Sequence, residues 1–299
     1  MRNITKVGSQ TDEGVISEFL QFLALGGRNT TGSTATRSNY QSTLRRLSRW
    51  LNIRGQTLLT AAPDDIAAWR AELTLSPKTI STYGATVKSF YLWARRAGRR
   101  VDDPTLDLIL PRVPPGLPRP IGEADLEMAI QTAPRRIRPW LVLAGYAGFR
   151  AIEIAQLERS QILNAADPPM FLFGGKGARW RAVPLSPYVW GELLAADLPT
   201  RGPCFRRQDG RIGANSANRI SQLANRHLRE LGVDGTLHGC RHRFGTQALL
   251  ACGNVRTVQE LLGHASIITT QLYTAIASPE MVAVVLAVQP ANPIPNSAA

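Results

Sequence analysis

The sequence predicts a mainly α-helical protein of two domains, the second of which carries one small antiparallel β-sheet. Three observations lead to this expectation. Apolar residues recur at spacings of three and four through most of the 299-residue chain. Prolines are concentrated near the end of its first third and separate two regions of helical pattern. One glycine-rich turn, at residues 174–177, separates two short segments of strand character.

A proline-rich linker is expected between the two domains. Six prolines lie between Asp102 and Pro120, and Pro114-Pro115-Gly116 fits neither a helix interior nor a central strand. The predicted order is an N-terminal tail, a helical bundle, the linker, a second domain that ends in a C-terminal helix, and a disordered tail. The corresponding residues are 1–13, 14–112, 113–120, 121–288 and 289–299.

The first domain is predicted to be a small helical bundle. Its helices are expected over residues 15–25, from a cap at Thr36 or Ser38 to Leu51, over 64–73, and from Ser76-Pro77 to Gly98. Serine is a good N-cap and proline suits the first helical position. Five aromatic residues are expected in its core rather than on a base-stacking surface: Trp50, Trp69, Tyr83, Phe90 and Trp93.

The second domain is predicted to combine helices with a β-hairpin. Helical patterns cover residues 123–132, 138–147 and 152–157, and further helices follow the hairpin. The expected strands are Met170–Phe173 and Trp180–Leu185. Glycines in the turn between them allow the positive φ values that a tight turn requires.

The charge of the chain favours a polyanionic partner. Its 35 Lys and Arg against 22 Asp and Glu give a formal net charge of +13. Residues 14–112 carry 14 basic and 7 acidic side chains, and residues 121–278 carry 18 and 12. Because both domains share the excess, the pattern suits a protein that surrounds nucleic acid better than one with a basic tail.

The sequence gives little support to a membrane protein, a disulfide-bonded protein or a zinc site. No apolar run approaches the roughly 18 to 20 residues of a membrane span, and no signal-peptide core follows the N-terminus. The three cysteines are odd in number and lack paired spacing. We therefore expect a reduced cytosolic protein without a membrane partner.

An uncommon set of polar residues interrupts the apolar helical pattern near the end of the second domain. His238 and Arg241 are three residues apart and share one helix face. Gly263-His264 follows, and Tyr273 lies nine residues after His264. Taken singly, each residue has an ordinary structural explanation, but together they support one another.

These motifs resemble those of the tyrosine recombinase family of phage integrases: H-x-x-R, then Leu-Gly-His, then a tyrosine nine residues later. Residues 145–157 are similar to the family's first arginine box, in which Arg150 matches the arginine and Glu153 its supporting acidic residue. Lys176 matches the lysine of the family's hairpin turn. The resemblance covers about residues 15 to 280 and is to simple integrases or Xer-like enzymes that lack an arm-binding domain.

The resemblance implies that Tyr273 attacks a DNA phosphodiester and forms a covalent 3′-phosphotyrosine. Two guanidiniums suit the clamping of phosphoryl oxygens on which negative charge grows, and Arg150 and Arg241 receive that role. A phenol has an ordinary pKa of about 10, so it needs such neighbours to act near neutral pH.

The remaining roles concern protons and strand exchange. By the same resemblance, His264 donates a hydrogen bond to a non-bridging oxygen, His238 assists proton transfer at the nucleophile, and Lys176 protonates the leaving 5′-oxygen. The phosphotyrosine conserves bond energy, so strand exchange through a Holliday junction needs no ATP. No metal and no cofactor are implied, and the implied function is integration or excision of phage or mobile-element DNA.

The resemblance also implies partners. The first domain would bind core-type DNA and the second would be catalytic, acting on double-stranded core attachment sites in a bacterial cytoplasm, at the nucleoid. Residues 279–288 contain an apolar run that would dock into a neighbouring subunit and build a homotetramer on paired sites, with packing in cis as the alternative. A host bending protein or an excision factor is a further candidate partner.

Three other functions compete with this one. A metal-dependent nuclease or transposase needs clustered carboxylates, and Asp167, Asp209 and Asp234 stand apart in loops. A non-catalytic DNA-binding regulator is disfavoured by the full set of site residues. Type IB topoisomerases share the mechanism, so DNA relaxation is a candidate side activity. Among the other polar residues, His227 and His242 are expected to be structural, and Arg179, Arg181 and Arg243 to be phosphate contacts or solvated charges.

Overall fold

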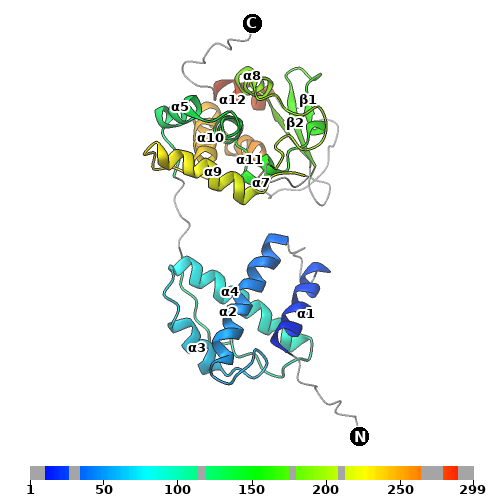
Figure 1. The fold of residues 1–299 in the computed structure, drawn as a ribbon, viewed down its shortest axis with the longest axis vertical. Helices are drawn as coiled ribbons and strands as arrows, with labels where there is room; N and C mark the ends of the chain where they lie inside the picture. Colours follow the sequence, from blue (N-terminus) through cyan, green and yellow to red (C-terminus); the bar gives the residue numbers. More distant parts are fainter. Residues whose placement is uncertain are drawn as a thin grey trace. The chain divides into compact units, whose positions relative to one another are not determined.

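The computed structural model describes residues 11–26, 34–113, 119–174, 180–207, 213–263 and 279–288 (Figure 1). They belong to two compact units, Met1–Gly116 and Leu117–Ala299. Both units are mainly helical and the second holds a three-stranded antiparallel sheet, so the predicted fold class is confirmed. Within the described ranges, no helix has both the length and the apolar character that a bilayer span requires.

The described residues of the first unit form four helices: α1 (Asp12–Ala24), α2 (Thr34–Asn52), α3 (Pro63–Ala71) and α4 (Pro77–Arg96). The predicted start of α4 is confirmed, because Ser76 accepts a hydrogen bond from the Thr79 N–H and Pro77 follows it. The predicted cap of α2 is wrong, since Thr36 and Ser38 lie inside a helix that begins at Thr34. Helix α1 also takes in residues 12 and 13 of the expected tail.

The five aromatic residues contribute to the core of this unit, as predicted. Trp69, Phe90 and Trp93 are buried, and Trp50 and Tyr83 pack against the same cluster while partly exposed. Phe90 and Trp93 also contact Phe19 of α1 through their rings. The unit therefore uses its aromatic side chains for packing between helices.

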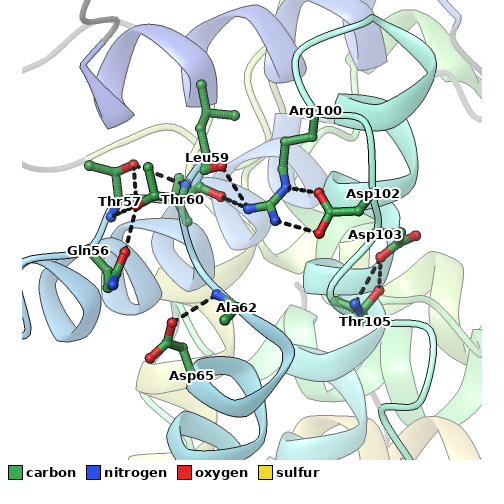
Figure 2. Close-up of polar contacts among 11 residues, drawn as sticks. Gln56, Thr57, Leu59, Thr60, Ala62, Asp65, Arg100, Asp102, Asp103 and Thr105 are labelled. Carbon is green, nitrogen blue, oxygen red and sulfur yellow. Dashed lines mark hydrogen bonds and ion pairs between the residues drawn. The ribbon is translucent and has the colours of Figure 1, made fainter.

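Arg100 fastens the end of α4 to the loop between α2 and α3. Its Nη1 donates to the Leu59 carbonyl at 2.8 Å, and its Nε and Nη2 donate to both oxygens of Asp102 (Figure 2). The loop is closed on itself by hydrogen bonds between Thr57 and Thr60. A bidentate charged contact of this kind fixes direction as well as distance.

Asp12 joins three segments of the first unit. Its buried carboxylate accepts hydrogen bonds from the Ser48 hydroxyl of α2 at 2.5 Å and from the Leu58 N–H at 2.9 Å. Asp12→Ala leaves both donors without their acceptor, so we expect the free energy of unfolding to fall by about 2 kcal/mol. Urea unfolding of the full chain measures this loss.

Asp64 provides the control for that measurement, because it is also an aspartate in a first helical turn but is exposed. We expect Asp64→Ala to change the free energy of unfolding by no more than about 0.5 kcal/mol. Equal losses in the two variants would show that the buried carboxylate has no special part in joining the segments.

The second unit is built around α6 (Arg138–Ala147), in which every residue from Pro139 to Ala147 is buried. A helix that is apolar on all sides needs neighbours on all sides. Those that pack on it are α5 (Glu123–Thr132), α7 (Ala151–Ala155), α8 (Pro187–Ala195), α9 (Ala217–Glu230) and α10 (Leu237–Cys252). Helix α11 (Val255–Leu262) packs on α10.

The sheet has the order β1-β2-β3, with β1 (Ile162–Leu163), β2 (Met170–Gly174) and β3 (Trp180–Pro184) all antiparallel. The β2-β3 hairpin was predicted, whereas the two-residue β1, which follows the short 3-10 turn η2 (Arg159–Gln161), was not. Phe171 of β2 pairs with both Ile162 and Val183, and all three are buried. The sheet thus presents one apolar face to the helical core.

Helix α12 (Pro279–Ala287) packs on its own unit against α10, α11 and β3. Val284, Val285 and Val288 join the core, each no more than 2% exposed. In the single chain this segment packs in cis, which was the alternative, and its docking into a neighbouring subunit stays a prediction. The expected tail at 289–299 and residues 114–118 of the expected linker lie outside the described residues.

Candidate active site

Four of the predicted site residues lie in the described part of the chain: Arg150, Glu153, His238 and Arg241. The other three, Lys176, His264 and Tyr273, lie outside the described residues. The structure brings Arg150, Glu153 and Arg241 into one cluster at the end of α6, with His238 on the helix of Arg241.

Arg150 is placed by the sharp end of α6. The helix stops at Gly148, which adopts a left-handed conformation with φ 69°, and Arg150 caps the next helix, α7. The backbone N–H of Arg150 donates to Glu153 Oε2 at 2.7 Å, and its Nη1 donates to Oε1 at 3.0 Å. Glu153 therefore fixes both the backbone and the side chain of Arg150.

Arg241 projects from α10 into the same cluster and is 3% exposed. Its Nη1 donates to the Gly148 carbonyl, and its Nη2 donates to the Leu262 carbonyl at 2.7 Å. Its Nη1 also lies 3.5 Å from Glu153 Oε2. The guanidinium thus joins the C-terminal ends of α6 and α11, next to the position where the chain continues to His264.

A third guanidinium enters from strand β3. Arg181 Nη2 lies 3.3 Å from Glu153 Oε2, and the side chain is 12% exposed. Its guanidinium carbon lies 4.9 Å from the centre of the Phe173 ring. The interpretation of Arg181 as a solvated charge is wrong, because strand β3 directs it inward; its companion Arg179 lies outside the described residues.

The cluster carries more positive than negative charge. Three guanidiniums share the one carboxylate of Glu153. Burial, then the charge of Arg150 and, less, that of Arg181, lowers the pKa of Arg241 to about 9, although Glu153 opposes them. Burial and Arg150 likewise lower the pKa of Arg181. A bound anion would relieve this repulsion, so the cluster has the charge that suits an anion such as phosphate.

His238 stands one helical turn before His242 on α10, and their ring centres are 4.4 Å apart. Partial removal from water lowers the pKa of His238, and charge on His242, Arg241 and Arg150 lowers it further. The ring is therefore neutral at pH 7 and able to accept a proton. His242, expected to be structural, is the direct neighbour of the candidate base.

The lowered pKa of His238 sets the expected pH dependence. An ordinary histidine titrates near pH 6.5, so a neutral His238 should sustain cleavage below that pH. The unfolded chain then binds a proton that the folded chain does not, so stability falls as the pH drops below 6.5. His242→Gln removes one source of positive charge, and we expect the acid limb of the pH–rate profile to move to higher pH.

His227 offers the matched control for this profile. Its buried ring contacts the Ala129 carbonyl through Nε2 at 2.8 Å, so the prediction of a structural role is confirmed. We expect His227→Gln to leave the acid limb in place. If His242→Gln also left it in place, the electrostatic coupling between the two histidines of α10 would be ruled out.

Arg243 has a structural role, and its interpretation as a phosphate contact or solvated charge is wrong. Its side chain is buried, pairs with Glu123 of α5, donates to the Gly145 carbonyl at 3.2 Å, and lies over the Tyr146 ring. These contacts fix α10 against α5 and α6, two residues after Arg241. Within the described part of the chain, no three His, Cys, Asp or Glu residues converge to hold a metal ion.

Known proteins are similar to this chain in sequence. The phage integrase family profile matches residues 123–280, and that of the phage integrase N-terminal SAM-like domain matches residues 16–98. Tyrosine recombinase XerD of Xanthomonas axonopodis pv. citri (strain 306) is 32% identical over 301 residues, covering 89% of this chain and 94% of the relative.

Solved structures are similar to this chain as well, among them two integrases. The integrase from mycobacterium phage Brujita is 26% identical, with a TM-score of 0.52 and coverage of 93% of each chain. A lambda integrase tetramer bound to a Holliday junction has a TM-score of 0.65 at 16% identity, covering 90% of this chain and 81% of the other, which shows a common fold. The chain therefore belongs to the phage integrase family, as an Xer-like tyrosine recombinase of site-specific recombination.

Proposed function

We propose that this recombinase integrates or excises phage or mobile-element DNA, cutting and rejoining each strand through Tyr273. The observation that carries the proposal is the cluster of guanidiniums around Glu153, which suits a phosphodiester. Support for a phage or mobile-element substrate comes from the likeness to the Brujita integrase along nearly the whole chain.

In the proposed step, the Tyr273 oxygen attacks phosphorus and the bond from phosphorus to the 5′-oxygen breaks. His238 takes up the phenolic proton, directly or through water, and Lys176 gives a proton to the leaving 5′-oxygen. Arg150 and Arg241 balance the charge that grows on the phosphoryl oxygens.

His264 adds a hydrogen bond to one of these phosphoryl oxygens. A 5′-hydroxyl from another strand reverses the reaction and produces a Holliday junction. The guanidiniums supply positive charge at the phosphate, and the phosphotyrosine conserves the bond energy, so the proposed reaction needs neither a metal ion nor ATP.

The proposed substrate is a pair of double-stranded core sites held by four copies of the chain. The lambda integrase tetramer on a Holliday junction supports this assembly, and the net charge of +13 supports extensive phosphate contact. We place the reaction in a bacterial cytoplasm, at the nucleoid, with a host bending protein or an excision factor as a candidate regulator of direction.

Selection of target DNA tests the proposal. The full chain first selects duplexes from a random pool, and two circles bearing selected sites with different flanks are then incubated with it in EDTA. Fused circles together with Holliday junctions are expected. Relaxed circles without exchange would favour a topoisomerase instead. Efficient recombination only between identical sites on one circle would overturn the integrase role and leave a resolving one.

A further inference from the structure

Arg181 is the one member of the guanidinium cluster to which the proposed step gives no task. It lies on β3, opposite Phe173 of β2, in the hairpin whose turn carries Lys176. Only 12% of its side chain is exposed. A buried guanidinium must be held by partners, and these partners indicate its use.

The first partner is the oxygen that organises the whole cluster. Glu153 Oε2 accepts the Arg150 N–H at 2.7 Å and lies 3.3 Å from Arg181 Nη2 and 3.5 Å from Arg241 Nη1. Arg181 thereby links strand β3 to the carboxylate that orients the other two guanidiniums.

The second partner is the turn after α11. Gly263 adopts a left-handed conformation with φ 62°, and a Cβ built there would lie 2.5 Å from Arg181 Nη1 and 2.9 Å from its Cδ. The guanidinium therefore occupies the space that a side chain at residue 263 would need. Gly263 directly precedes His264 in the sequence, so Arg181 lies against the last described residue before that histidine.

The third contact is aromatic. The Arg181 guanidinium lies 4.9 Å from the centre of the Phe173 ring and 6.0 Å from that of Phe149. Phe149 is the residue between Gly148 and Arg150. One side chain thus lies against β2, the connection between α6 and α7, and the end of α11.

We propose that Arg181 is a positioning residue that docks the β2-β3 hairpin and the turn at Gly263 onto Glu153, and so sets Lys176 and His264 at the scissile phosphate. The inference rests on the proposed function, because it takes the roles of Lys176 and His264 from there. It predicts that losing Arg181 disturbs leaving-group protonation and loosens two segments that are distant in sequence.

Hydrogen exchange tests the docking without reference to activity. In Arg181→Met, we expect faster exchange of backbone amides in residues 170–174, 180–184 and 255–263 of the full chain. Val183→Ala is the matched control, since Val183 lies on the same face of β3 and is fully buried. It should loosen the strands alone. Unchanged exchange over residues 255–263 in Arg181→Met would overturn the inference, whatever the role of Lys176.

A substrate with sulfur in place of the bridging 5′-oxygen tests whether loss of Arg181 disturbs leaving-group protonation, because a thiolate leaves without needing a proton. We expect Arg181→Met to slow cleavage of the ordinary substrate about 100-fold, in the range of a lost general acid. The sulfur substrate should recover the part of this loss that comes from leaving-group protonation, while the part that comes from His264 remains. Lys176→Ala should be rescued in the same way, with Arg181→Lys intermediate on the ordinary substrate.

The Arg181→Met and Lys176→Ala variants distinguish failure of this inference from failure of the proposed function. Rescue of Lys176→Ala without rescue of Arg181→Met would overturn the inference and leave the proposed function standing. Failure to rescue Lys176→Ala would refute its role as general acid in the proposed function, and the exchange rates over residues 255–263 would then decide the inference alone.

Discussion

Arg241→Met should slow formation of the covalent DNA adduct about 10³-fold or more. Loss of a preorganised charged group that stabilises a phosphoryl transition state has effects of this order. Methionine fills a similar space but offers no donor to the phosphate, to the Gly148 carbonyl or to the Leu262 carbonyl. The measurement is single-turnover cleavage of a nicked duplex, with the adduct quantified on a denaturing gel.

Arg256→Met is the control for Arg241→Met. Arg256 lies on α11 and forms an exposed ion pair with Glu260 at 2.6 Å, and we expect its loss to leave cleavage unchanged. Unfolding curves must show that Arg241→Met remains folded at the assay temperature. A folded Arg241→Met protein within tenfold of the parent rate would remove this residue from the phosphate site.

The second large effect is expected at Gly148, where both arginine-bearing segments meet. A Cβ built there would lie 2.5 Å from Phe244 Cδ1 and 3.0 Å from Leu262 Cδ2, and the φ of 69° is unfavourable for any side chain. Left-handed strain costs roughly 1–2 kcal/mol and overpacking roughly 1–3 kcal/mol. Gly148→Ala should therefore lower the free energy of unfolding by about 2–5 kcal/mol.

Gly253→Ala separates the two contributions. Gly253 caps α10 with nearly the same φ, 63°, but a Cβ there meets nothing within 4 Å. We expect Gly253→Ala to cost only the strain of roughly 1–2 kcal/mol, as measured by chemical denaturation. Equal losses at the two glycines would mean that Phe244 and Leu262 yield easily and that the close approach has no energetic weight.

The Gly148→Ala protein that remains folded should also cleave DNA slowly. The added Cβ forces the backbone at residue 148 to move, and this movement displaces the carbonyl that Arg241 contacts. The corresponding Gly253→Ala protein should cleave at the parent rate. This difference links the sharp end of α6 to catalysis as well as to stability.

The parts of the fold that local pattern controls were predictable. Residues 123–132 and 138–147 are helical with the expected ends. The hairpin followed from two short strands around glycines. The two-residue β1 was not predictable, because it exists only through pairing with β2.

The buried arginines mark where local pattern fails. Arg243 is enclosed because Glu123, 120 residues earlier, meets it after folding, and no local spacing reveals that pair. Arg181 had a usable signal, since alternation along β3 places it on the same face as the buried Val183. The cis packing of α12 depends on a surface made by α10, α11 and β3, which residues 279–288 alone cannot specify.

The identity of the residue that becomes joined to DNA tests the central claim most directly. The full chain is incubated in EDTA with a nicked duplex of a selected core site, the adduct is digested, and the nucleotide-bearing peptide is identified by mass spectrometry. We predict a 3′-phosphodiester on Tyr273 and no adduct from Tyr273→Phe. Attachment elsewhere, an adduct from Tyr273→Phe, or cleavage only with added divalent metal would contradict the account.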